Sequence, residues 1–205
     1  DVKSVNKEEL KLELVDKWIF SRMNETSKEV ADYIDKFQLD DAAKAVYEFL
    51  RGDFCDWYVE LAKVRLYNDD EAGKASKTTA QYVLWTVLEA GLRMLHPFMP
   101  FITEEIWQTL RERQDGESIM ISRLPKATSY DESYLLRFEA VKNIIVGIRN
   151  IRKQNNIAFK DVLELKVKKN ERYPASFDSI IRKMGNIGQI GLVNEPVKGA
   201  WSFIV

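Results

Sequence analysis

The chain has 205 residues, of which 45% are hydrophobic and 31% charged, and its formal net charge is −1 at pH 7. This composition allows a folded domain with a buried core, and no apolar run reaches the roughly 18 to 20 residues of a membrane span. One cysteine and one histidine exclude an internal disulfide and argue against a structural zinc site, so we expect a reducing, cytoplasmic setting. The chain begins at Asp1 without a signal peptide, so we expect it to be part of a longer protein.

The charged residues are distributed unevenly. Residues 1–140 carry 19 Lys and Arg against 27 Asp and Glu, whereas residues 141–205 carry 12 against 5. An acidic segment is therefore followed by a basic one. A solvated, lysine-rich surface explains such a segment, and so does a footprint for nucleic-acid phosphates.

Helical periodicity dominates the first part of the chain. Asn6 and Glu9 form a capping pattern, after which apolar residues recur at spacings of three, four and seven up to Phe37. Asp40 suits the N-cap of a second helix with a wide apolar face. The polar run 68–76 then predicts a loop.

A third helix, with an apolar stripe over residues 80–95, is predicted to stop at a pair of prolines. Pro97 lacks an amide donor and disfavours helical backbone at His96, whereas Pro100 suits the first turn of a fourth helix that reaches about Arg113. Apolar bulk around this elbow predicts that it is anchored in a core by Leu95, Phe98, Met99, Phe101, Ile102 and Trp107.

Residues 114–130 contain Gly116, Pro125 and only a short apolar triplet, so we expect a long, extended connection along the bundle. A fifth helix is expected from about Asp131 to Asn155 and Asn156, with a buried stripe between Leu135 and Ile151.

From residue 162 the apolar period changes to two, as in a strand with one solvated face. Residues 174–185 then predict a helix, and the runs at 187–192 and 200–205 predict two further strands.

The predicted fold class is therefore mainly α. We expect an antiparallel helical bundle over residues 1–156 and a small β-α-β-β annex over residues 157–205 that stops in the middle of a strand.

The sequence offers few groups for catalysis. His96 is held in the proline elbow, which favours a structural role, and Cys55 sits among aromatic residues, as a small core residue would. Glycine-rich nucleotide loops of the usual kinds are absent, so we expect no catalytic residue and no metal site. A set of aromatic residues suits either a core or a stacking platform for unpaired bases: Tyr47, Phe54, Trp57 and Tyr58.

Better candidates for contact with a nucleic acid lie at the end of the fifth helix, where cations also suit the helix dipole. Together with Lys160, Lys166, Lys168 and Lys169 of the annex, they would form one continuous surface beside a phosphate backbone. The candidate nucleic-acid-binding residues are Arg149, Asn150, Arg152, Lys153, Asn155 and Asn156.

Four segments carry a resemblance to a known family. They are DFCDWYVELAK at 53–63, LHPFMPFITEEIWQ at 95–108, GESIM at 116–120 and IRNIRKQNNI at 148–157. In order and spacing, they resemble the anticodon-binding region of the valyl-tRNA synthetase family, which belongs to the class I aminoacyl-tRNA synthetases.

This resemblance implies that the chain is the tRNA-binding, non-catalytic part of a valine–tRNA ligase. The parent enzyme would use ATP with Mg²⁺, and the chain itself would hold no cofactor. Its expected partners are valine tRNA and the catalytic and editing domains of the same polypeptide, with IRNIRKQNNI as a tRNA-facing segment.

Three alternatives stay open. The nearest is the corresponding domain of an isoleucyl or leucyl ligase, because these relatives share the bundle and the proline elbow, although the pairing of FCDWY with LHPFMPF is typical of the valine enzyme. A helical protein-interaction scaffold with a solubilising basic face is an alternative of another class, and a free-standing enzyme is the third.

Overall fold

The computed structural model describes residues 10–67, 70 and 73–205. Contacts divide the chain into two compact units, Asp1–Asp131 and Glu132–Val205. The first is helical, and the second adds a small parallel sheet, which confirms the predicted class of mainly α with a small α/β part. Within the described ranges, no helix combines the length and hydropathy that a membrane span requires.

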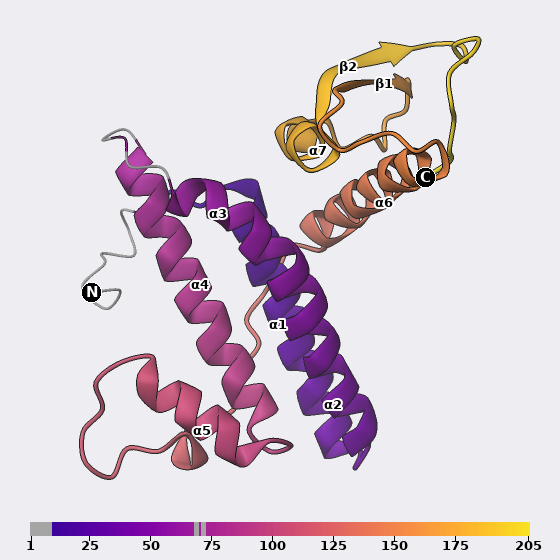
Figure 1. Ribbon diagram of the computed structural model, residues 1–205. Coiled ribbons are helices and arrows are strands. Elements are labelled where there is room, and N and C mark those ends of the chain that lie inside the picture. The colour runs from indigo at the N-terminus through magenta and orange to yellow at the C-terminus, as the bar shows by residue number, and fades with distance from the viewer. Residues whose placement is uncertain (1–9, 68–69, 71–72) are drawn as a thin grey trace. The chain divides into compact units, whose positions relative to one another are not determined.

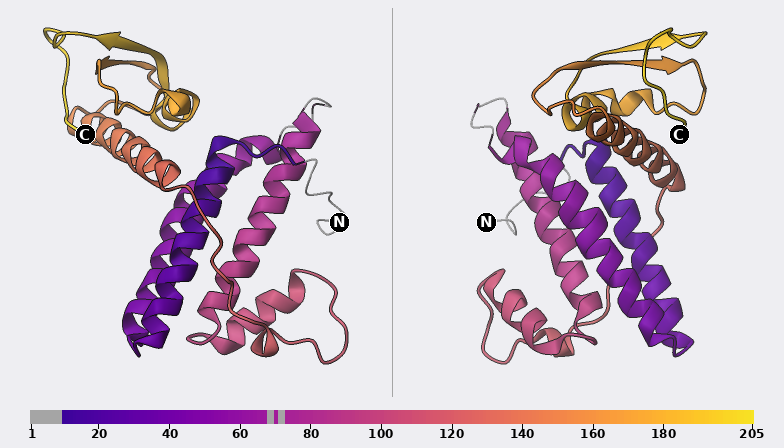
Figure 2. Two further views of the ribbon diagram at one scale, coloured as in Figure 1. Left: turned by 180° about the vertical axis from the view of Figure 1, so that it is seen from behind. Right: turned by 45° about the vertical axis from the view of Figure 1, so that its right-hand side comes forward.

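The first unit is a helical bundle in which α1 contacts both α2 and α4. Figures 1 and 2 show these three helices running side by side along their lengths. In chain order, the elements are α1 (Leu14–Asp35), α2 (Leu39–Tyr47), the π-helix η3 (Glu48–Val59), α3 (Glu60–Leu66), α4 (Lys74–Leu95), α5 (Pro100–Thr109) and the 3₁₀ turn η5 (Ile119–Ile121).

Two predicted helix starts differ from the structure. The pattern at Asn6 and Glu9 lies outside the described residues, and α1 begins at Leu14. The N-cap of α2 is Gln38, so the prediction of Asp40 as N-cap was wrong by two positions. Asp40 instead lies in the first turn, where its carboxylate suits the positive end of the helix dipole.

The predicted second helix is one helical run in three parts, because a π-helix interrupts it. Hydrogen bonding from i to i+5 shifts the phase of the buried face. Phe54 is 5% exposed and Tyr58 is fully buried, as the core interpretation predicted, and Phe49 joins them although helical spacing did not place it there. Tyr47, on the predicted apolar face, is 54% exposed.

A buried polar group ties α1 to the end of this run. Asp16 is fully buried and accepts hydrogen bonds from Arg65 Nη1 at 2.7 Å and from Tyr58 Oη at 2.6 Å. Burial and the neighbouring carboxylate raise the pKa of Tyr58. Arg65 Nε also lies 3.2 Å from Glu13 Oε1, so the guanidinium joins two carboxylates at the start of α1 to α3.

The proline elbow ends α4 at Leu95 and starts α5 at Pro100, as predicted. His96, however, keeps helical dihedral angles, with φ −53° and ψ −41°, which corrects the expectation that Pro97 would exclude them. The pre-proline restriction is a preference, and here the His96 amide still donates to Leu92 O at 2.9 Å. The His96 Nδ1 atom lies 2.7 Å from Thr103 Oγ1, so the ring joins the end of α4 to the first turn of α5.

The apolar anchoring of the elbow was predicted wrongly for three residues. Met99, Phe101 and Ile102 are 50%, 90% and 47% exposed, because they face outward from the first turn of α5. Trp107 alone of the predicted set is buried, in a small cluster with Leu92 and Ile119.

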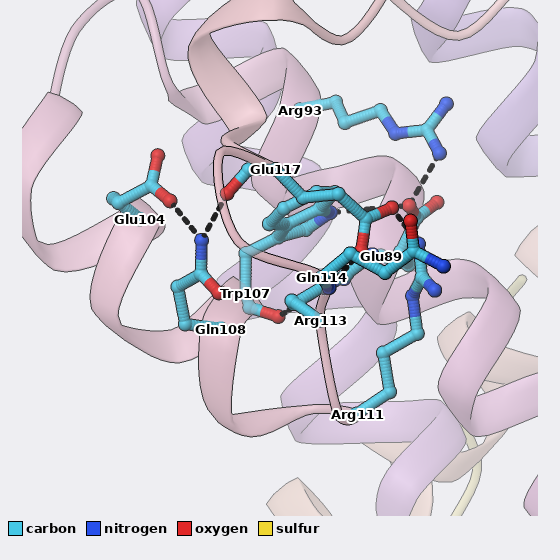
Figure 3. A network of polar contacts seen from close by, with 9 residues as sticks. All are labelled: Glu89, Arg93, Glu104, Trp107, Gln108, Arg111, Arg113, Gln114 and Glu117. Carbon is cyan, nitrogen blue, oxygen red and sulfur yellow. Dashed lines mark hydrogen bonds and ion pairs between the residues drawn. The ribbon is translucent and has the colours of Figure 1, made fainter.

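Polar contacts around Trp107 fasten α5 to α4 (Figure 3). Its Nε1 donates to Glu89 Oε1 at 3.2 Å, and the Arg113 guanidinium lies 3.1 Å from the centre of its ring. Arg113 Nη2 also donates to the Trp107 carbonyl oxygen at 3.0 Å. The helix ends at Thr109 instead of near Arg113, and this arginine binds back to it from the following loop.

The predicted long connection is confirmed. Residues 110–131 are irregular apart from η5; in Figure 2 they first loop out beyond α5 and then run along the bundle. Glu104 of α5 accepts from Ser118 Oγ at 2.6 Å and from the Ile119 amide at 3.1 Å. Further along, the Thr128 amide donates to Asn24 Oδ1 of α1 at 2.9 Å, which holds the connection against the helix.

The second unit contains a long helix and a β-α-β arrangement, whose strands pair in parallel with one register shift between Leu163 and Glu164. A parallel pair needs a crossover, which α7 provides. The elements are α6 (Glu132–Gln154), β1 (Leu163–Lys168), the 3₁₀ turn η6 (Ala175–Phe177), α7 (Asp178–Gly185) and β2 (Ile187–Val193).

The long helix packs with the annex, so the division at 131/132 differs from the expected boundary at 156/157. Phe138 of α6 meets Phe177 edge to face, with ring centres 5.7 Å apart, and both are fully buried. Farther along α6, Ile148 contacts Gly185 at the end of α7.

The predicted third strand is absent, because residues 200–205 have no strand structure. They return to α6 instead (Figure 1), where a Cβ atom added at Gly147 would lie only 2.2 Å from the Phe203 ring. Phe203 thus covers the helix instead of pairing with β2.

Candidate nucleic-acid interface

The last turns of α6 carry the predicted interface. Arg149, Asn150, Lys153 and Asn156 are exposed, and Asn155 is half-buried. Residues four apart share a helix face, so Arg149 and Lys153 present two cations on the same side. Lys153 also lies in the last turn of α6, where the dipole stabilises positive charge.

Arg152 does not belong to this exposed group. It is 5% exposed and donates to three carbonyl oxygens of the same unit: Ala158 at 2.9 Å, Gly185 at 2.9 Å and Asn186 at 3.1 Å. Helical phase explains the correction, because position 152 lies four residues after the buried Ile148 and thus on the packed face. Its guanidinium is directed into the protein and not toward a ligand.

Asn156 ends the helix in left-handed backbone, with φ +52°. Its amide donates to Lys153 O at 3.4 Å, and the next amide, of Ile157, donates to Arg152 O at 2.9 Å. These two bonds form a Schellman motif, in which glycine or asparagine is the usual residue. The left-handed backbone therefore accounts for an asparagine at position 156, independently of any contact with a ligand.

The loop after α6 carries Lys160, which is exposed. Asn186, the left-handed residue after α7, donates from Nδ2 to Phe159 O at 2.6 Å and to Asp161 O at 3.4 Å. Lys160 is thus presented between two anchored carbonyl groups.

On β1 the predicted alternation is confirmed, and Lys166 and Lys168 lie on its exposed face. Lys166 forms an ion pair with Glu164 at 3.2 Å, so part of its charge is compensated on the same face. The cations of α6, the following loop and β1 all belong to the second unit.

One surface aromatic was missed by sequence reasoning. Phe37 was placed on a buried stripe, yet it is 89% exposed and has φ +59°. Its amide and that of Gln38 donate to Ile34 O and Tyr33 O, at 3.0 and 2.8 Å, so Phe37 occupies the left-handed position of another Schellman motif. The two predicted helices are separated by very few residues, and so short a connection requires a residue with left-handed backbone. This spacing was the signal in the sequence from which the exposed position could have been predicted.

Two shallow cavities open on the first unit, and both mix charges of either sign. One, of about 370 Å³, is lined by Arg111, Glu112, Arg113, Gln114 and Glu117. The other, of about 450 Å³, lies beside η3 and includes the Arg22–Asp53 ion pair, with 2.8 Å between Nε and Oδ2.

Cys55 is exposed, which corrects its predicted place in the core, because the π-helix turns it outward. Partial burial and Asp56 raise the pKa of its thiol, which disfavours the nucleophilic thiolate. Among the residues that the structure describes, no cluster of three or more His, Cys, Asp and Glu side chains could hold a metal ion.

The chain thus consists of a helical bundle followed by an α/β unit whose long helix ends in exposed positive charges. The family described as the anticodon-binding domain of tRNA ligase matches residues 16–168, and the chain belongs to this family.

Its similar relatives are valine–tRNA ligases. The chain is 61% identical over 160 residues to that of Fusobacterium nucleatum, which covers 77% of this chain and 18% of the relative. It is 37% identical over 207 residues to that of Thermotoga maritima, covering 100% of this chain and 23% of the relative. It thus spans about a fifth of their length.

Proposed function

We propose that this chain binds the anticodon arm of valine tRNA as a non-catalytic part of a valine–tRNA ligase. The observation that carries the proposal is the family match over residues 16–168, together with the similarity to valine–tRNA ligases. Amino-acid activation with ATP and Mg²⁺ would take place elsewhere in the longer protein, which would act in the cytoplasm. The catalytic and editing domains of that polypeptide are its further partners.

The electrostatics of the second unit support binding to RNA. Exposed Arg149 and Lys153 on α6, and Lys160 on the next loop, supply positive charge within a short stretch of chain. Asn150 and Asn156 add exposed amides, which can donate to and accept from base edges. Phosphate contacts of this kind position an RNA, while the amides provide bonds that depend on the base.

Phe37 supports a second contact, in the first unit. A freely exposed aromatic ring is a surface on which an unpaired base stacks. The neighbouring Asp35 and Asp40 are exposed carboxylates that outnumber the exposed Lys36, so capture of phosphates is assigned to the second unit and not to this turn.

The test is fluorescence anisotropy with labelled valine tRNA across a series of salt concentrations. We expect the affinity to fall with salt, and the variants Lys153→Gln and Lys160→Gln each to lower the slope of log K against log salt by about one. Lys28→Gln is the matched control, because this lysine is exposed on α1, outside the candidate segment.

Two outcomes separate the alternatives. Higher affinity for isoleucine or leucine tRNA than for valine tRNA would favour the sibling ligases over the valine enzyme. Binding that is absent, or indifferent to salt, would contradict the proposal and favour a protein-interaction scaffold.

A further inference from the structure

We propose that Arg152 is a positioning residue for tRNA binding, which acts from inside the second unit by holding the loop that presents Lys160. The proposal rests on the proposed function, and it assigns to Arg152 a role other than contact with RNA. Three observations carry it: the burial of the side chain, the elements that its hydrogen bonds join, and the second anchor on the same loop.

Arg152 joins three parts of the fold. From α6, one arm of its guanidinium reaches Ala158 in the following loop, while the other reaches Gly185 and Asn186 at the end of α7. The Gly185 carbonyl, at the last residue of α7, has no partner within its own helix, so a cation there satisfies it and suits the helix dipole. The Asn186 carbonyl oxygen also accepts the Leu163 amide at 3.3 Å, so the same point is joined to β1. At 5% exposure, the side chain has no open path to a phosphate.

Asn186 anchors the same loop from the other side. Its side-chain amide donates to Phe159 O and Asp161 O, which flank Lys160. The Arg152 guanidinium carbon also lies 5.6 Å from the centre of the Phe159 ring. The loop is therefore fixed at 158, 159 and 161, and Lys160 projects from the short stretch between these points.

A fixed loop should raise the affinity for RNA. A lysine that is already held in place loses less conformational entropy when it contacts the RNA than a lysine on a mobile loop would. Lysine cannot replace arginine in this role. A single ammonium group concentrates its donors at one point, whereas the planar guanidinium reaches carbonyl oxygens on two separate elements.

The test compares Arg152→Lys and Arg152→Gln for affinity and salt slope with labelled valine tRNA. We expect both variants to bind the tRNA roughly tenfold more weakly. The two losses of affinity should be equal, because each substitution breaks the hydrogen bonds from residue 152 to Ala158, Gly185 and Asn186, although only glutamine removes the positive charge. A phosphate ligand would behave differently: lysine would restore both affinity and slope.

Asn186→Gly provides a second variant that does not depend on Arg152. Glycine keeps the left-handed backbone at φ +49° and removes only the side-chain contacts to the loop. We expect weaker binding with unchanged helix content in far-ultraviolet circular dichroism, so a loss of affinity is not confused with unfolding.

The control is Lys160→Gln, which should lower the salt slope without disturbing the backbone amide signals of residues 185 and 186 in nuclear magnetic resonance spectra, whereas Arg152→Gln should shift them. Full affinity in Arg152→Lys, or in folded Asn186→Gly, would overturn the proposal while leaving the proposed function intact. If the unaltered chain itself binds no tRNA, the proposed function fails first.

Discussion

At the scale of single residues, Phe37 stands where the backbone favours glycine. A bulky side chain with positive φ costs about 1 kcal/mol or more, and its exposed ring recovers little of this through packing. The same left-handed position is filled by asparagine at 156 and 186.

We therefore expect Phe37→Asn to stabilise the chain by about 1 kcal/mol, because asparagine tolerates left-handed backbone better. Urea unfolding followed by circular dichroism measures the change. Phe101→Asn is the control, since Phe101 is equally exposed, at 90%, but lies in helical backbone, where the substitution should give no gain. A marked destabilisation by Phe37→Asn would show that the ring packs against the protein.

Single residues also show where periodicity misleads. The pattern of apolar residues predicted Phe54 and Tyr58 in the core correctly, because both lie on the inner face of a long helical run. It failed for Phe37, which is exposed, whereas for Arg152 the concentration of charge misled although helical phase from Ile148 indicated a buried position. Chemical type sets the average preference of a residue, whereas the contacts around it decide each case.

At the scale of elements, Glu104 joins α5 to the loop that follows. Hydrogen bonds to Ser118, Gln108 and the Ile119 amide lower the pKa of its carboxyl group, and Ser118 contributes most. A lowered folded-state pKa means that the stabilisation is fully present above the ordinary value of 4.5 and is lost as the pH falls through the folded value.

We expect hydrogen-exchange protection of the Ile119 amide to decrease as the pH is lowered below about 4.5, once exchange rates are corrected for their intrinsic pH dependence. Glu104→Gln should weaken this protection at neutral pH and remove its dependence on acid. Glu105→Gln alters the exposed neighbouring carboxylate and should behave like the unaltered chain. Protection that is insensitive to acid would mean that Ile119 is held by its apolar cluster alone.

Element boundaries were predicted best where prolines or asparagines interrupt the chain. Pro100 begins α5 and Asn156 follows α6, because proline presets the first helical turn and asparagine accepts left-handed backbone. The π-helix was not predicted, because no residue type specifies i to i+5 hydrogen bonding, and its segment lies packed against α1 and α4.

At the scale of the whole molecule, α6 belongs with the β-α-β arrangement. A fragment of residues 132–205 should therefore fold by itself, whereas residues 157–205 should not, because removal of α6 exposes the buried faces of Phe177 and Ile181. Circular dichroism melting of the two fragments measures the difference.

Phe138→Ala in the longer fragment is the companion variant. Loss of this fully buried ring should cost about 3–5 kcal/mol, enough to unfold a unit of this size. A cooperative melting transition in residues 157–205 alone would restore the boundary at 156/157 and contradict the assignment of α6 to the second unit.

By itself, the sequence determined the helical class, the proline elbow, the long connection and the strand-helix-strand order of the annex, because these follow from local spacing and backbone preference. It also carried the motifs by which the chain resembles its family. Only the tertiary structure decided that α6 packs with the annex, that residues 200–205 cover a helix instead of forming a strand, and that Arg152 is directed inward. These outcomes depend on which surfaces meet, and contacts between residues distant in the chain leave no periodic trace in the order of the amino acids.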